Sequence, residues 1–240
     1  MMKRGPQSGL EKKLSIKNLL KVVRESFDIP EPKREEKRGL VSKISIKDCL
    51  MSSFAMFSLK MQSLLAFDNA SNNKIIKHNL KSLYKLEAAP SHTYMREKLD
   101  PVDPEKLRPA FLNLFEEIQR GKLLAQYVFM NGYLLAVDGT EVFESKNVFC
   151  DNCGVREHSN GIKGYYHQIL AGSIIKPGLK QVIPLCPEPI VKQDGTTKND
   201  CESNAMRRFL NHVKKEHPRL NFTIVTDALT ANTPGVNFRL

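Results

Sequence analysis

The chain has 240 residues, enough for one or two domains with buried cores, and its 41% hydrophobic and 26% charged residues are ordinary for a globular protein. The net charge of +11 is unusual and uneven, because residues 1–100 carry 20 Lys and Arg against 11 Asp and Glu, a net charge of +9. This excess favours nucleic acid over a membrane surface as the partner, with a merely solvated basic surface as the alternative.

Targeting, membrane and disulfide signals are not evident in the sequence. Lys3 and Arg4 are followed by no apolar h-region, and six polar residues interrupt the most apolar stretch, residues 49–67. The five cysteines are not spaced as a disulfide framework, which indicates a reducing compartment. We therefore expect a cytoplasmic, nucleoid-associated protein without a membrane partner.

The first half of the chain predicts helices. Ser15 is placed to cap a helix over residues 16–27, after a disordered stretch at residues 1–12. Further helical patterns cover residues 46–66, 74–86 and 104–120, and residues 90–104, which contain three prolines, are expected to be a connector. One helix face carries lysines that can either lie along DNA phosphates or simply be solvated: Lys74, Lys77, Lys81 and Lys85.

The second half of the chain predicts a sheet. An apolar run at residues 133–137 leads into Asp138 and Gly139, and a second one at residues 222–226 leads into Asp227. Between them we expect a hairpin arm at residues 141–149, a polar loop at 150–164, and strands at 165–175 and 180–185. A second loop at 187–199 then leads to a helix at 201–215 that Asp200 caps.

This order predicts three antiparallel strands, a crossover helix and a fourth strand parallel to the first. That arrangement is the opening of an RNase H-like fold, here incomplete and preceded by a helical region. Three parts are expected. Residues 1–44 form a basic, partly disordered segment with one helix, residues 45–125 a helical DNA-binding or accessory region, and residues 126–240 the partial catalytic domain.

Two aspartates at the ends of neighbouring parallel strands would converge on one spot. Mg²⁺ prefers one or two carboxylates together with phosphate oxygens, and a pair of ions about 3.5–4 Å apart supports phosphoryl displacement. Taken singly, Asp138 or Asp227 is more simply explained as a strand-end residue. A third acid is also normally needed; Glu141, Glu188 and Glu202 are local candidates, and Glu202 is better explained by its place in the first turn of a helix.

A second cluster suggests zinc. Cys150 and Cys153 form half of a tetrahedral site, and His158 and His167 are available to complete it. The spacing matches no standard zinc finger, so reduced cysteines in a polar loop are the alternative reading.

An ordered set of short motifs resembles DDE-type insertion-sequence transposases (ISNCY type). The motifs span residues 45–240 and include LLAVDGTE at 134–141, CDNC at 150–153, NG at 160–161 with YH at 166–167, VIPL at 182–185, DG at 194–195 with DCE at 200–202, and TDAL at 226–229. The resemblance implies an RNase H-like domain that cleaves and transfers DNA strands with Mg²⁺ or Mn²⁺. It also implies that Asp138 and Asp227 are the first two catalytic carboxylates.

The resemblance also sets what is expected to be missing. Its third carboxylate, a glutamate, belongs well downstream of the second aspartate, whereas this sequence ends 13 residues after Asp227, at Leu240. Ala228 also stands where another acid is common. We therefore expect a C-terminally truncated copy that is inactive alone. The expected partners are DNA, at element ends and target, and further copies of the chain; a non-catalytic DNA-binding protein derived from a transposase is the alternative.

Overall fold

The computed structural model describes residues 14–31, 44–159, 161–191 and 202–227. The chain divides into two compact units, residues 1–121 and 122–240. The disorder predicted for residues 1–12 and the helix cap predicted at Asp200 lie outside the described residues.

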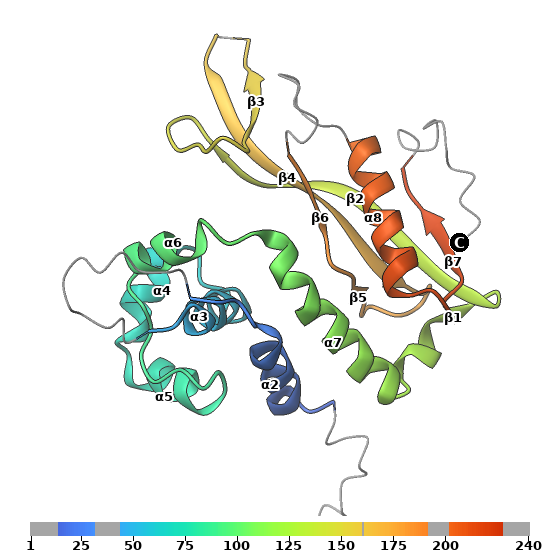
Figure 1. The fold of residues 1–240 in the computed structure, drawn as a ribbon, viewed down its shortest axis with the longest axis horizontal. Helices are drawn as coiled ribbons and strands as arrows, with labels where there is room; N and C mark the ends of the chain where they lie inside the picture. The colour runs from blue at the N-terminus through green and yellow to red at the C-terminus, as the bar shows by residue number, and fades with distance from the viewer. Residues whose placement is uncertain (1–13, 32–43, 160, 192–201, 228–240) are drawn as a thin grey trace, which may run out of the picture. The chain divides into compact units, whose positions relative to one another are not determined.

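The first unit is helical (Figure 1). Its elements are α2 (Ile16–Ser26), α3 (Ile46–Ser58), α4 (Leu64–Ser71), α5 (Lys74–Ser82), α6 (His92–Leu99), the 3₁₀ turn η1 (Pro104–Leu107) and α7 (Arg108–Arg120). Each of the helices α2 to α7 contributes to one apolar core, in which Met51, Phe67 and Met95 are fully buried. Burial of each such side chain contributes about 1.5–3 kcal/mol.

Serine caps set several of the helix starts. The predicted cap at Ser15 is confirmed, since its Oγ accepts a hydrogen bond from the Asn18 N–H at 3.3 Å. The single helix predicted over residues 46–66 is wrong, because α3 ends at Ser58 and Ser63 caps a new helix by accepting from Ala66 N–H at 3.1 Å. A polar side chain that satisfies free N–H groups here outweighs the apolar periodicity.

The connector predicted at residues 90–104 is also wrong, because it contains α6. Ser91 caps this helix by accepting from the Tyr94 N–H. Asp68 accepts from both the backbone N–H and the ring Nδ1 of His92, at 3.1 and 3.0 Å. The side-chain bond, followed by the backbone bond, lowers the pKa of the Asp68 carboxyl. A long-range acid therefore stabilises a short helix that local sequence does not reveal.

In the described residues of the second unit, seven strands form one sheet and one α-helix is present. Figure 1 draws these strands and this helix. The elements of this unit are the 3₁₀ turn η2 (Leu123–Tyr127), β1 (Val128–Phe129), β2 (Gly132–Ser145), β3 (Gly154–Glu157), β4 (Lys163–Ile175), β5 (Ile183–Pro184), β6 (Glu188–Ile190), α8 (Glu202–Glu216) and β7 (Phe222–Val225). Strand β2 pairs antiparallel with β4 and β1, and parallel with β7. Strand β4 also pairs antiparallel with β3, β5 and β6. The predicted parallel pairing of the first and last strands is confirmed.

Three predicted details of the sheet are wrong. The chain does not turn back after Asp138, because β2 continues to Ser145 and stays paired with β4 along that length. The loop predicted at residues 150–164 contains β3, and the loop predicted at 187–199 contains β6. Each error has the same cause: polar segments form strands when a long neighbouring strand satisfies their backbone hydrogen bonds.

Helix α8 covers one face of the sheet. Phe209 is 1% exposed and its ring lies directly over Gly172 of β4. The buried side chains of Leu135, Leu170 and Ile174 also lie in this unit's core. Because strand residues alternate between faces, odd-numbered residues of β2 up to Gly139 share the helix-covered face, and Asp138 lies on the other one. Among the described residues, no helix is long and apolar enough to cross a bilayer.

A buried histidine next to α8 predicts a pH-dependent stability. His217 is 8% exposed and packs edge-on against Phe222 at 6.4 Å between ring centroids. Burial lowers the pKa of His217 from 6.5 to about 4. Between pH 6.5 and about 4, the imidazole binds a proton in the unfolded chain but stays neutral in the folded protein. The free energy of unfolding is therefore unaffected above pH 6.5 and decreases as the pH falls from 6.5 to about 4.

We expect the neutral His217 to lower the free energy of unfolding by about 2 kcal/mol at pH 5 relative to pH 7. Urea unfolding at both pH values should show the loss in the wild-type chain, and His217→Gln should reduce it. The exposed His78→Gln is the matched control. An unchanged pH dependence in His217→Gln would contradict the assignment.

Candidate functional site

The two predicted aspartates lie in one open pocket of about 510 Å³ on the face of the sheet opposite α8. The parallel register pairs Ala136 of β2 with Val225 of β7. Asp138 and Asp227 follow these two residues by two positions, so the register brings the two aspartates side by side. The structure thus joins two acidic residues that are far apart in sequence.

The floor of the pocket is made of small side chains. Ala136 pairs with Ser173, and Asp138 pairs with Ala171, across the antiparallel ladder between β2 and β4. Small residues leave space above the backbone, while both aspartates are exposed to solvent. The pocket therefore has room for an ion and for part of a larger, anionic ligand.

The strand-end placement predicted for Asp138 is wrong, since this residue lies inside β2. Its backbone is held by the pairing with Ala171, whereas Asp227 follows the end of β7. One carboxylate thus stands on a rigid ladder and the other on the segment that leaves the sheet. A rigid element is the more precise support for a ligand.

None of the local acids considered as a third ligand lines the described pocket. Glu141 binds Arg156 with an N–O distance of 2.9 Å. Glu188 is buried and bonds Arg208 at 2.7 Å. The carboxylate of Glu202 lies against Gly139, where the Cδ atom would be 2.6 Å from an added Cβ, on the α8 side of the sheet. Together with Asp138 and Asp227, these acids form no three-ligand group within 4.8 Å in the described residues.

The close contact of Glu202 with Gly139 was missed by the sequence reasoning, which explained this glutamate by its helix position alone. Gly139 has no side chain, and this lets the first turn of α8 approach the strand directly beside Asp138. A glycine immediately after a strand aspartate was the available signal, since such glycines often mark a close approach.

The four predicted DNA-binding lysines are exposed, but they are not equivalent. Lys74, Lys77 and Lys81 belong to α5, and Lys81 pairs with Glu87 at 2.6 Å. Lys85 lies beyond the helix and lines a groove of about 350 Å³ in the helical unit. The groove's other basic residues are Lys17, Lys21, Arg24 and Lys47.

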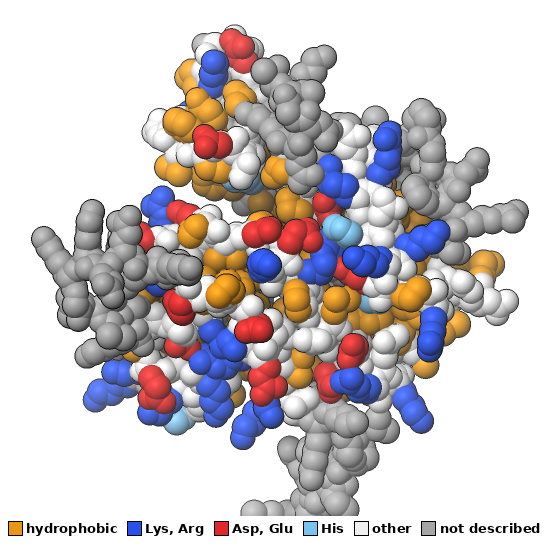
Figure 2. Space-filling view, viewed as in Figure 1, with side chains coloured by type: hydrophobic (Ala, Val, Ile, Leu, Met, Phe, Trp, Pro, Cys, Tyr) orange, Lys and Arg blue, Asp and Glu red, His pale blue; other side chains and the backbone are white. Residues whose placement is uncertain are grey.

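This groove concentrates positive charge. Arg24 is neutralised by Asp48 at 2.6 Å, and Lys21 contacts Glu25 at 3.6 Å, whereas Lys17, Lys47 and Lys85 have no ion pair within the described part of this unit. Figure 2 shows basic and acidic side chains interspersed over the visible face rather than a continuous basic stripe. The groove is accordingly a better candidate for phosphate contacts than α5 as a whole.

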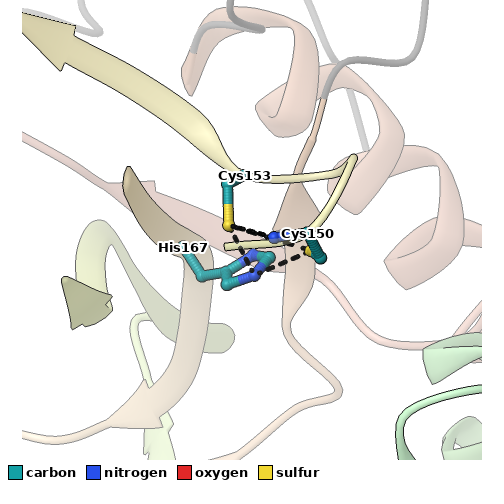
Figure 3. A group of neighbouring side chains, drawn as sticks. All are labelled: Cys150, Cys153 and His167. Atoms are coloured by element: carbon teal, nitrogen blue, oxygen red, sulfur yellow. Dashed lines mark hydrogen bonds between the residues drawn. The ribbon is translucent and has the colours of Figure 1, made fainter. Parts of the chain in front are cut away.

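The predicted zinc ligands separate into two groups. Cys150, Cys153 and His167 come together, with each donor atom within 4.8 Å of the others (Figure 3). His158 is not a member of this group. Its Nε2 lies 3.3 Å from Glu144 Oε1, in a contact without hydrogen-bond geometry. The structure therefore selects one of the two candidate histidines.

Comparison of the chain with protein-family models, curated proteins and solved structures finds no match. What the fold and the site define is a helical unit followed by a mixed sheet with one crossover helix, and two carboxylates that share a pocket on that sheet.

Proposed function

We propose that this chain is a DNA strand-cleaving and strand-transferring protein of the DDE transposase kind. In this proposal the sheet unit is RNase H-like, and Asp138 and Asp227 are its metal-binding carboxylates. The observation that carries it is the shared pocket of these two aspartates on neighbouring parallel strands. The strand order supports it as well, since β4 runs antiparallel to β2, β6 runs antiparallel to β4, and α8 leads to β7, which is parallel to β2.

The two carboxylates suit Mg²⁺ or Mn²⁺. Ionised aspartates are acceptors only, and hard divalent cations prefer a few such oxygens together with substrate phosphates. When bound, the metal supplies Lewis-acid activation of a phosphoryl group and of the attacking oxygen. Asp138 and Asp227 would hold the metal, while Ala136, Ala171 and Ser173 leave the space in which a phosphate could approach.

The helical unit supplies DNA affinity in this proposal. Lys17, Lys47 and Lys85 lie in the basic groove and are available to neutralise phosphates. Such contacts release counterions, so binding weakens steeply as salt rises. They position the duplex without reading its sequence.

A second function, DNA binding without catalysis, is favoured by one observation. Among the described residues, no third acid lines the pocket that holds the two aspartates. A transposase-derived DNA-binding protein would keep the basic groove and the fold but would cleave no strand. Metal-dependent chemistry separates the two proposals, because both predict salt-dependent DNA binding.

Substitution of either aspartate tests the proposal. The full chain should bind Mn²⁺, detected by electron paramagnetic resonance, and, against the inactivity expected from its sequence, should nick labelled duplex DNA when Mg²⁺ or Mn²⁺ is added and only then. Asp138→Asn and Asp227→Asn should each abolish nicking and weaken Mn²⁺ binding, because an amide is neutral and coordinates a divalent cation less strongly. DNA binding measured in metal-free buffer should be unchanged.

The exposed Asp28→Asn, in the other unit, is the matched control and should retain both properties. Nicking that survives Asp138→Asn would refute the catalytic proposal. Salt-sensitive DNA binding with neither nicking nor Mn²⁺ binding in the wild-type chain would favour the non-catalytic protein, and absence of DNA binding would refute both.

A further inference from the structure

We propose that Cys150, Cys153 and His167 form a zinc site that ties the segment after β2 to an arm of the sheet. The arm is defined here as β3 (Gly154–Glu157) together with residues 163–167 of β4. This inference goes beyond the proposed function and does not depend on it. The ligands are drawn in Figure 3, where both sulfur atoms lie beside the His167 ring.

Strand register brings the first two ligands together. Gly154 pairs with Tyr166 in the antiparallel ladder between β3 and β4, so the preceding residue, Cys153, lies next to His167. On the other side of β4, His167 pairs with Phe143 of β2, immediately after a β-bulge at Val142. The position of His167 is therefore set by its pairing with β2 and by the pairing of its neighbour Tyr166 with β3.

A tight turn brings in the third ligand. The Cys153 N–H donates to the Cys150 carbonyl at 3.1 Å, which folds residues 150–153 back on themselves. The Cys150 N–H in turn donates a hydrogen bond to Cys153 Sγ at 3.3 Å. An N–H directed at sulfur stabilises the negatively charged thiolate, which is the form that binds metal.

The distances between donor atoms fit tetrahedral zinc. Zn–S bonds of about 2.3 Å and a Zn–N bond of about 2.0–2.1 Å, at tetrahedral angles, separate two sulfurs by about 3.8 Å and a sulfur from a nitrogen by about 3.6 Å. The observed separations are 3.8 Å between the sulfurs, and 3.4 and 3.3 Å from His167 Nε2 to Cys150 Sγ and Cys153 Sγ. The sulfur separation is also far longer than the roughly 2.05 Å bond of a disulfide.

The chemistry of the donors fits the same ion. Two thiolates and an imidazole are the ligand types that select zinc over Mg²⁺ or Ca²⁺. His167 Nε2 faces both sulfurs, so a neutral ring with its proton on Nδ1 presents a lone pair to the metal. The described residues supply three of the four donors that a tetrahedral zinc ion takes.

The site would add a fixed point to an arm whose described contacts lie near the surface: residues 165–167 pair with β2, and Arg156 bonds Glu141 at 2.9 Å. Among the described strands, the four residues of β3 pair with β4. Nearby, Phe149 stacks on Tyr165 at 4.5 Å between ring centroids, and Arg156 lies 4.8 Å over the Tyr166 ring. His167 precedes Ala171 by four residues on the same strand face, so the zinc site stands on the face of the sheet that carries the Asp138 pocket. Zinc would thus order the arm that extends from the pocket.

Metal analysis of the full chain tests the ligand set. After expression with zinc and gel filtration, mass spectrometry should find one zinc ion per chain. Cys150→Ser, Cys153→Ser and His167→Asn should each lose most of it. The matched controls are His158→Asn, which alters the rejected histidine, and Cys186→Ser, which alters a buried cysteine elsewhere in the sheet unit; both should retain zinc.

Cobalt provides a second readout on the unmodified protein. Co²⁺ added to zinc-free chain should produce thiolate-to-cobalt charge-transfer and intense tetrahedral d–d absorption, which one equivalent of Zn²⁺ abolishes. Thiol labelling should show the exposed Cys150 protected until a chelator is added. Cys49 should stay unlabelled throughout, since it is fully buried and burial raises the pKa of its thiol to about 11.

Hydrogen exchange then tests the structural role. Removing zinc should speed amide exchange in the arm by at least about tenfold while leaving residues 133–138 of β2 unchanged. Zinc-free wild-type protein without thiolate–cobalt absorption would overturn the site. Loss of zinc from His158→Asn with retention by His167→Asn would overturn the ligand set. Amide exchange in the arm at the same rate with and without zinc would overturn the structural role.

Discussion

Replacing Arg208 with alanine is expected to lower the free energy of unfolding of the sheet unit by about 3 kcal/mol. Arg208 on α8 donates from Nε to Glu188 Oε1 at 2.7 Å and from its terminal nitrogen to the Pro189 carbonyl at 3.0 Å. The Glu188 side chain is 3% exposed, so without Arg208 a charged carboxylate stays buried beside His212, whose Nδ1 lies 3.2 Å from Glu188 Oε2.

The size of the effect follows from which partner is removed. The side chain of Arg208 is 25% exposed and is readily rehydrated, whereas that of Glu188 is 3% exposed, so a carboxylate left without its partner has little access to water. Loss of the arginine is therefore more costly than loss of the glutamate. The double variant Arg208→Met with Glu188→Leu should recover most of the stability, because replacing both charges by apolar groups is often neutral.

Urea unfolding at pH 7, followed by far-ultraviolet circular dichroism, measures the change. Arg207→Ala, one position earlier on the same helix and exposed, should remain within about 0.5 kcal/mol of the wild type. A similarly small effect for Arg208→Ala would show that the buried pair does not hold β6 against α8.

Replacing Phe209 with alanine should cost the sheet unit about 3–5 kcal/mol. Its ring is 1% exposed and fills the space over Gly172, where an added Cβ would overlap Cζ and lie 2.8 Å from Cε1. The truncation leaves a cavity between α8 and β4 at the level of Val137, which pairs with Gly172. This is the packing that supports the strand carrying Asp138.

The same unfolding measurement on Phe209→Leu should show a smaller loss, since a leucine fills part of the cavity. Asn211→Ala, on the exposed side of the helix, is the matched control. Equal stability of Phe209→Ala and the control would mean that α8 does not pack on the sheet as described.

Local chemistry in the sequence was sufficient for several elements. The cap at Ser15 acts within three residues, and the apolar runs before Asp138 and Asp227 indicate strands by themselves. The pairing of those strands was also predictable, because a crossover helix between two strands favours a parallel neighbour. The shared pocket of Asp138 and Asp227 follows from that pairing.

Tertiary structure decided the remainder, because partners distant in sequence supplied the hydrogen bonds and burial. The ladder with β4 carries β2 past Gly139 to Ser145, and the pairing with β4 turns residues 154–157 into β3. Register placed His167, rather than His158, beside the cysteines. Arg208 made Glu188 a buried ion-pair partner instead of a loop acid. Short-range patterns report what a segment favours, whereas long-range pairing determines which backbone groups and charges are satisfied.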